Sequence, residues 1–289
     1  MRRILAALSL LPATALADVP KVITDVAPIQ SLTAQVMGDL GTPDMLLQPG
    51  ADPHDFSLRP DQAERLGQAD LVIWVGEALI PWLEEPLQTL APQAPRFSLL
   101  EVDGWTPLVI PEGNAGDIDP HAWMDPTVAQ TWVAAIAGAL SDADPDNAAT
   151  YAANAEATIA NLGALDAQLA SQLAGLEDRA YVLPHDGYRY FETRFGLTAQ
   201  AAIAGIDART PGPAQIAEIR DQMTEQNVVC VFSDAEIGDR WANVITEGTD
   251  ARTVMIDGVG VGLEAGPTLY GQMLERLAGQ FTACLGGGA

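Results

Sequence analysis

The chain has 289 residues, and its 39 acidic and 14 basic side chains give a formal net charge of −25. This acidic balance argues against nucleic acid or an anionic membrane as a partner, whereas a cation remains compatible with it. Acidity alone does not indicate a metal site, because most surface carboxylates serve solubility.

Residues 1–17 have the pattern of a secretory signal peptide. Arg2 and Arg3 precede an apolar run over residues 4–11, and small residues close the segment at Ala17. The apolar run is too short for the roughly 20 residues that cross a bilayer. We therefore expect cleavage after Ala17 and release of the remaining chain into the periplasm. A lipid anchor is not expected, because the residue directly after the cleavage point is not a cysteine.

The first part of the mature chain alternates short apolar runs with amphipathic stretches. The runs predict strands at residues 22–26, 45–48, 71–75 and 97–100. The stretches predict helices at residues 28–38, 60–66 and 77–90, with one more starting near Asp125. Two internal prolines are expected to kink or divide the helix at 77–90.

Residues 145–176 differ from the rest because they lack proline after Pro145 and carry apolar residues at helical spacing. This pattern predicts one long helix. At 1.5 Å per residue, about 30 residues would reach roughly 45 Å, enough to join two lobes along their length. Such a connector is stiff and should limit the lobes to small relative movements. The alternative is a helical hairpin broken near Gly163.

The last part repeats the alternation of strands and helices. Strands are predicted at residues 181–183, 199–203, 228–232 and 253–256, and helices at 187–195, 213–226, 236–247 and 267–284. Such alternation indicates parallel sheets covered by helices on both faces. The predicted fold is therefore α/β with two lobes, each a four-stranded mainly parallel sheet flanked by helices. The predicted boundaries are 18–143 for the first lobe, 144–176 for the rigid linking helix and 177–289 for the second lobe.

Cys230 and Cys284 are the only cysteines. In an oxidising compartment such a pair is expected to form a disulfide. The bridge would close a loop of about 55 residues and stabilise the fold by roughly 4 kcal/mol on the chain-entropy model. Two buried free thiols are the alternative. A cysteine metal site is disfavoured, since neither residue has a cysteine or histidine near it in sequence.

All three histidines of the chain, His54, His121 and His185, directly follow a proline. A single histidine in a loop is usually a surface residue, but three in the same setting favour a metal site. His54 and His185 follow predicted strands, where ligands bind in open parallel sheets, and His121 precedes a predicted helix. Zinc prefers imidazole nitrogens with a carboxylate or thiolate completing a tetrahedron.

Asp257 is the expected fourth ligand, because it follows the predicted strand 253–256 at the sheet edge that should present His185. Asp55 and Asp186 neighbour histidines and are candidates to orient an imidazole. Three other carboxylates are interpreted as solvated or capping groups: Asp119, Glu77 and Asp234. Since imidazoles must be neutral to coordinate, zinc affinity is expected to weaken below about pH 6.

Several segments make the chain resemble the zinc-specific solute-binding proteins of ABC transporters, the ZnuA-type family within metal-binding cluster A-I. They are PGADPHDFSLRP at 49–60, DPHAWMDP at 119–126, VLPHDGYRYFETRFGL at 182–197, and residues 254–262 followed by 270–285. The resemblance implies one Zn²⁺ held between two lobes joined by a long helix. It also implies these residues: the ligands His54, His121, His185 and Asp257, and the disulfide partners Cys230 and Cys284.

The resemblance further implies an ABC permease in the inner membrane as the partner of a monomeric receptor, and it leaves room for a periplasmic zinc chaperone. Manganese-binding relatives place a glutamate where this chain has His185, so zinc is favoured over manganese or iron. Many zinc-binding members carry a long histidine-rich acidic loop before the second ligand. Residues 105–118 are short and lack histidine, so an auxiliary metal site is not expected there.

Two other classes of function are weighed against the receptor. A zinc hydrolase would use Asp186 or Asp55 as a base, but the chain has no HExxH motif, and a fourth protein ligand would close the position that catalytic water needs. A surface adhesin or structural protein would leave the three Pro-His segments without a role. The sequence therefore predicts a binding protein and not an enzyme.

Overall fold

A computed structural model describes residues 19–48, 50–51, 53–54, 56–110, 113–114, 116–209, 211–234 and 238–287. The predicted signal peptide, Asp55 and the first residues of the predicted helix 236–247 lie outside these ranges. Two four-stranded sheets form the framework, with the strand orders β2-β1-β3-β4 and β6-β5-β7-β8. Neighbouring strands in both sheets are parallel. The predicted fold class is confirmed.

The first half of the chain builds the first sheet, whose strands have two to four residues and are fully or partly buried. Its elements are β1 (Val22–Thr24), α1 (Ala27–Met37), β2 (Asp44–Met45), α2 (Pro60–Leu66), β3 (Leu71–Trp74), α3 (Glu84–Leu90), β4 (Arg96–Ser98) and α4 (Pro126–Ala143). The predicted helix 77–90 is divided, as expected, because Pro81 starts a short 3₁₀ turn before α3. Helix α4 is capped by Asp125, whose Oδ1 accepts the amide of Thr127 at 2.7 Å.

The second half of the chain, which builds the second sheet, repeats the layout. Its elements are β5 (Tyr181–His185), α6 (Arg189–Phe195), β6 (Ala201–Ala204), α7 (Pro213–Glu225), β7 (Cys230–Asp234), α8 (Arg240–Thr246), β8 (Arg252–Ile256) and α9 (Leu269–Leu285). One difference bears on function: β5 runs through Pro184 to His185, which pairs with Ala204. The strand predicted at residues 181–183 therefore extends to His185, and the expectation that His185 follows the strand is wrong. A proline is tolerated there because the pairing of β5 with β7 ends at Val182, so that Pro184 has a strand neighbour on one side only.

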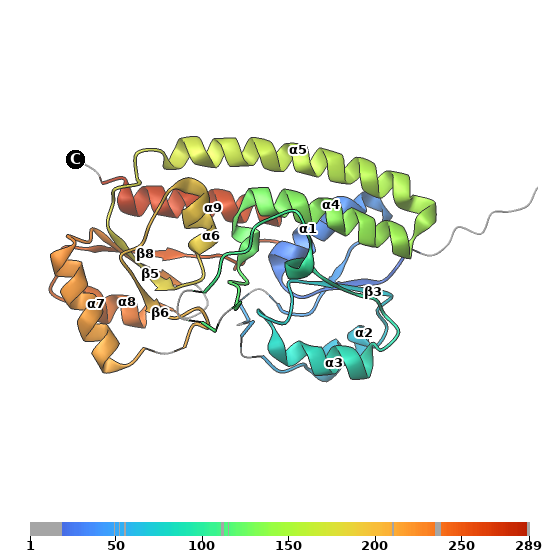
Figure 1. Cartoon of the computed structure of the whole chain (residues 1–289), viewed down its shortest axis with the longest axis horizontal. Helices are drawn as coiled ribbons and strands as arrows, with labels where there is room; N and C mark the ends of the chain where they lie inside the picture. The colour runs from blue at the N-terminus through green and yellow to red at the C-terminus, as the bar shows by residue number, and fades with distance from the viewer. Residues whose placement is uncertain are drawn as a thin grey trace, which may run out of the picture.

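Helix α5 (Ala148–Leu173) is continuous over 26 residues, roughly 39 Å. Gly163 lies within it without a break, so the alternative of a hairpin at that residue is wrong. Figure 1 shows α5 running across both halves of the molecule, over α4 and α9. It packs on α1 and α4 of the first half and on α9 of the second. Apolar side chains of both halves also belong to one buried cluster, so the connector is stiff, while the exact lobe boundaries remain a prediction.

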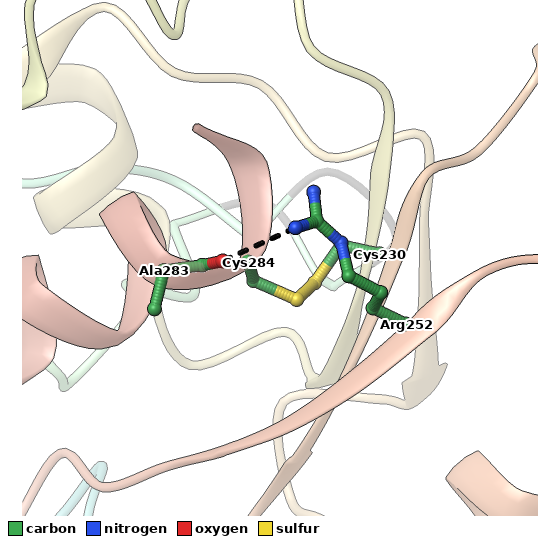
Figure 2. The surroundings of a disulfide bond; sticks show 4 residues. All are labelled: Cys230, Arg252, Ala283 and Cys284. Carbon is green, nitrogen blue, oxygen red and sulfur yellow. Dashed lines mark hydrogen bonds between the residues drawn. A yellow bond between two sulfur atoms is a disulfide. The ribbon is translucent and has the colours of Figure 1, made fainter. Parts of the chain in front are cut away.

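Cys230 and Cys284 form the predicted disulfide, which joins the start of β7 to the end of α9. Both residues are fully buried. Figure 2 shows Arg252 of β8 beside the bridge, donating to the carbonyl of Ala283 at 3.5 Å. The bridge therefore fixes α9, which contacts both α1 and α5, to the second sheet. Across the described part of the chain, no helix has the length and apolar character to cross a bilayer.

Candidate metal centre

The three histidines meet where the two sheets face each other. His54 lies in the segment between β2 and α2, His121 caps the short turn Ala122–Met124, and His185 ends β5. The ring centroids of His54 and His121 are 5.5 Å apart, and those of His121 and His185 are 5.6 Å apart. Three imidazoles on one tetrahedral zinc, with Zn–N distances of roughly 2.0–2.1 Å, would have centroids about 5 Å apart. The rings are thus close to a common ligating arrangement.

A small cavity separates the rings. Its volume is about 20 Å³, room for about one water molecule or one ion. Its walls come from both halves of the chain: Pro53, His54, His121, Trp123 and Met124 from the first, and His185, Tyr188, Ala208, Asp234, Gly258 and Val259 from the second. A cavity of this size admits a bare cation but no ester or peptide substrate.

Asp119 fixes the ring of His121. Its Oδ1 accepts the backbone amide of His121 at 2.9 Å and lies 2.9 Å from Nδ1 of the same residue. Because the carboxylate accepts a hydrogen bond from Nδ1–H, the lone pair of Nε2 is left for a metal. Asp119 is fully buried, so its interpretation as a solvated or capping group is wrong. The signal was present in the sequence as a carboxylate two residues before a histidine.

Asp234 lies beside the ring of His185. It ends β7, is almost fully buried, and accepts a hydrogen bond from the hydroxyl of Tyr188 at 2.8 Å. Its Oδ2 lies 3.5 Å from Nδ1 of His185, and Nδ1 is buried without a hydrogen-bond partner among the described residues, so Asp234 is near this ring without holding it. The interpretation of Asp234 as a solvated or capping group is therefore wrong as well. Glu77, the third residue of that group, is exposed as expected.

Gly187 gives the histidines the space to converge. A Cβ added there would lie 2.2 Å from Nε2 of His185 and 3.1 Å from Nε2 of His121. Both Nε2 atoms therefore face the same small volume beside this backbone. Gly187 was not among the predicted site residues, although it follows the second histidine-carboxylate pair, His185-Asp186, by one residue.

Asp257 lies directly after β8, as predicted, but it is not among the described residues that line the cavity. Oδ1 accepts the amides of Val259 at 3.0 Å and Gly260 at 2.9 Å. Oδ2 pairs with Nη2 of Arg276 on α9. The structure thus places Asp257 beside the centre without presenting a carboxylate oxygen to the imidazoles.

The two carboxylates that neighbour histidines in sequence have different outcomes. Asp55 lies outside the described residues. Asp186 is partly buried, and its backbone amide donates to Ala204 at 3.2 Å. Burial is the main cause that raises the pKa of Asp186, and Arg189 opposes it. Its predicted role in orienting an imidazole stays a prediction.

The surroundings of His54 favour its neutral imidazole. Burial, followed by the positive charge that His121 and His185 would carry, lowers the pKa of His54 to about 3. His54 therefore keeps its lone pair at any periplasmic pH, and proton competition at this ring begins well below pH 6. Among the described residues, no three histidine, cysteine, aspartate or glutamate side chains are arranged to hold a metal ion as they stand. Coordination thus needs a small adjustment of the rings, as their centroid separations also indicate.

Comparisons with known proteins identify relatives of the whole chain. The model of the family described as "Zinc-uptake complex component A periplasmic" matches residues 22–284. The high-affinity zinc uptake system protein ZnuA of Paracoccus denitrificans is 36% identical over 97% of this chain and 96% of its own. ZnuA of Brucella abortus is 30% identical over 91% of each chain.

A solved structure of a ZnuA deletion variant with bound zinc has a TM-score of 0.82 at 23% identity, covering 93% of this chain and 100% of that chain. That likeness concerns the fold: two lobes of the same architecture. The family model covers nearly the whole mature chain, including all three histidines and both cysteines. The chain belongs to the family of periplasmic zinc-uptake component A proteins.

Proposed function

We propose that this chain captures one Zn²⁺ in the periplasm with His54, His121, His185 and Asp257 and delivers it to an ABC permease. The observation that carries the proposal is the convergence of three imidazoles, from three separate segments and both sheets, on a cavity of about 20 Å³. Family membership and the zinc-uptake relatives support the same cargo. The ligand role of Asp257 requires its carboxylate to turn toward the cavity.

The donor set favours zinc over the cations that other family members bind. Three imidazole nitrogens and one carboxylate suit a four-coordinate zinc, whereas manganese favours oxygen-rich shells of higher coordination. One relative, the iron-binding protein YfeA of Yersinia pestis, is 32% identical over 80% of this chain, so iron and manganese are the competitors to test. A hydrolase is not supported, because the cavity has no room for a substrate beside the ion.

The proposal also covers how zinc reaches the site and where it goes afterwards. Cleavage after Ala17 releases a monomeric receptor, and a permease in the inner membrane receives the ion. Because residues 105–118 contain no histidine, a metal-gathering loop is absent from that stretch of sequence. A separate zinc chaperone in the periplasm fits this composition.

The test uses the mature chain purified without added metal. Mass spectrometry should find one zinc per chain, and anomalous scattering at the zinc edge should place it among the three imidazoles and Asp257. Competition with a chromophoric chelator should show preference for zinc over manganese and iron, and a large loss of affinity in each His→Ala variant. Zinc held elsewhere, or wild-type affinity in the three histidine variants, would refute the site. Asp257→Ala tests the fourth ligand separately.

A further inference from the structure

The carboxylate of Asp257 is fully engaged within the protein. Two backbone amides, from Val259 and Gly260, donate to Oδ1 at 3.0 and 2.9 Å, and the guanidinium of Arg276 pairs with Oδ2. The residue is only 3% exposed. A carboxylate this buried needs a compensating charge. In this structure Arg276 supplies that charge.

Arg276 reaches the site from the middle of α9. Besides pairing with Asp257, it donates from Nη1 to the carbonyl of Val261 at 3.0 Å, so one guanidinium holds both ends of the turn 257–261. Its side chain is 32% exposed, and its Nε is buried without a partner among the described residues. Arginine keeps its charge at every physiological pH. The guanidinium is therefore a permanent positive charge beside Asp257.

A zinc ion and this guanidinium would compete for the same oxygen. We propose that Arg276 is an internal competitor for the fourth zinc ligand: it neutralises Asp257 in the zinc-free protein and gives up Oδ2 when the carboxylate turns to zinc. This inference rests on the proposed ligand role of Asp257. A rotation of the carboxylate moves both oxygens, so the exchange also releases Oδ1 from the amides of Val259 and Gly260.

The exchange has two consequences for transport. Part of the free energy of zinc binding is used to separate Asp257 from Arg276, so the pair weakens the affinity of the site. When zinc leaves, the guanidinium returns to Oδ2, so the buried carboxylate is not left uncompensated and release is faster. Arg276 thus sets both affinity and release rate without contacting the ion.

The variant Arg276→Gln removes the competing charge. Its dissociation constant for Zn²⁺, measured by chelator competition, should fall by roughly 5- to 150-fold, the usual range for coupling between two ligands. Zinc loss to excess chelator should slow. Arg276→Lys keeps a positive charge and should stay near wild type. Arg194→Gln is the matched control, because Arg194 pairs with Asp166 and neither residue lines the cavity.

The double variant Asp257→Ala with Arg276→Gln separates this inference from the proposed site. It should bind zinc like Asp257→Ala alone, because the competitor then has nothing to compete for. Weaker or unchanged affinity in a folded Arg276→Gln, together with weaker affinity in Asp257→Ala, would overturn the competition and leave the site intact. Wild-type affinity in Asp257→Ala would instead show that the carboxylate is not a ligand.

A second measurement follows Arg276 in the wild-type protein. In the wild-type protein labelled with ¹⁵N-arginine, the side-chain signal of Arg276 should shift and its exchange with water should accelerate when one equivalent of zinc is added. The signal is assigned by its absence from Arg276→Lys. An Arg276 signal unchanged by stoichiometric zinc would overturn the inference.

Discussion

Replacing Gly187 by alanine is expected to weaken zinc binding without unfolding the protein. The backbone at Gly187 lies outside the left-handed region, so it accepts alanine without strain. The three atoms nearest to the added methyl group all belong to the metal centre: Nε2 and Cδ2 of His185, at 2.2 and 2.7 Å, and Nε2 of His121, at 3.1 Å. The closest clashes therefore fall on two of the proposed ligands.

The size of the effect follows from these distances. Ordinary van der Waals contact begins at 3.4 Å, so Nε2 of His185, at 2.2 Å, would have to retreat by about 1.2 Å, the difference between the two. Zinc–ligand distances tolerate about 0.2 Å, so His185 would leave the coordination shell. Loss of a residue that only orients a ligand weakens metal binding about 10- to 100-fold. Displacing the ligand itself should weaken it by at least about 100-fold.

Chelator competition measures the dissociation constant, and the visible spectrum of the Co²⁺-loaded protein reports the change in coordination. Gly212→Ala is the control, because a Cβ there meets nothing within 4 Å and φ is ordinary; it should keep wild-type affinity. A folded Gly187→Ala protein with wild-type melting temperature, affinity and Co²⁺ spectrum would refute the convergence of His121 and His185 beside this glycine.

Three further predictions use the same protein. Asp119→Asn should weaken zinc binding about 10- to 100-fold in chelator competition, because His121 loses the carboxylate that orients it. Changing both Cys230 and Cys284 to alanine should lower the free energy of unfolding in urea by roughly 2–5 kcal/mol, with zinc affinity retained. Burial raises the pKa of Asp25 to about 7, against about 3.9 when unfolded, so the folded protein retains a proton that the unfolded chain loses. The stability contributed by protonated Asp25 is complete below about pH 4 and is lost as the pH rises through 7. Wild type should therefore lose stability relative to Asp25→Asn between pH 5 and 8. A constant difference between the two proteins would contradict this.

The order of strands and helices could be predicted from the sequence because hydrophobic periodicity and proline positions are local signals. The division of the helix at Pro81 and the start of α7 at Pro213 follow from the fixed φ of proline and its missing N–H. The extension of β5 to His185 could not be predicted in this way. A proline normally argues against a strand, and its tolerance here depends on its neighbour in the sheet.

The candidate ligands were visible in the sequence because three histidines in one setting are chemically distinctive. Their supporting residues were not. Asp119 and Asp234 read as ordinary surface carboxylates among 39 acidic residues, since burial is a property of the folded chain. Arg276 lies in the middle of an amphipathic helix, and only the tertiary packing brings it to Asp257. Gly187 leaves room for the imidazoles of His185 and His121 because it has no Cβ, and no sequence pattern indicates this role.

The stiffness of α5 and the release of zinc are compatible because little movement is needed to break the site. His54 and His121 precede α5 in the chain, and His185 and Asp257 follow it, so each half supplies part of the proposed shell. Since ligand distances tolerate only about 0.2 Å, a shift of one half against the other by about 1 Å would remove ligands from the ion. A partner that contacts both halves could therefore release the ion by a small relative displacement, without opening a hinge. On the proposal above, Arg276 would then pair with Asp257 again.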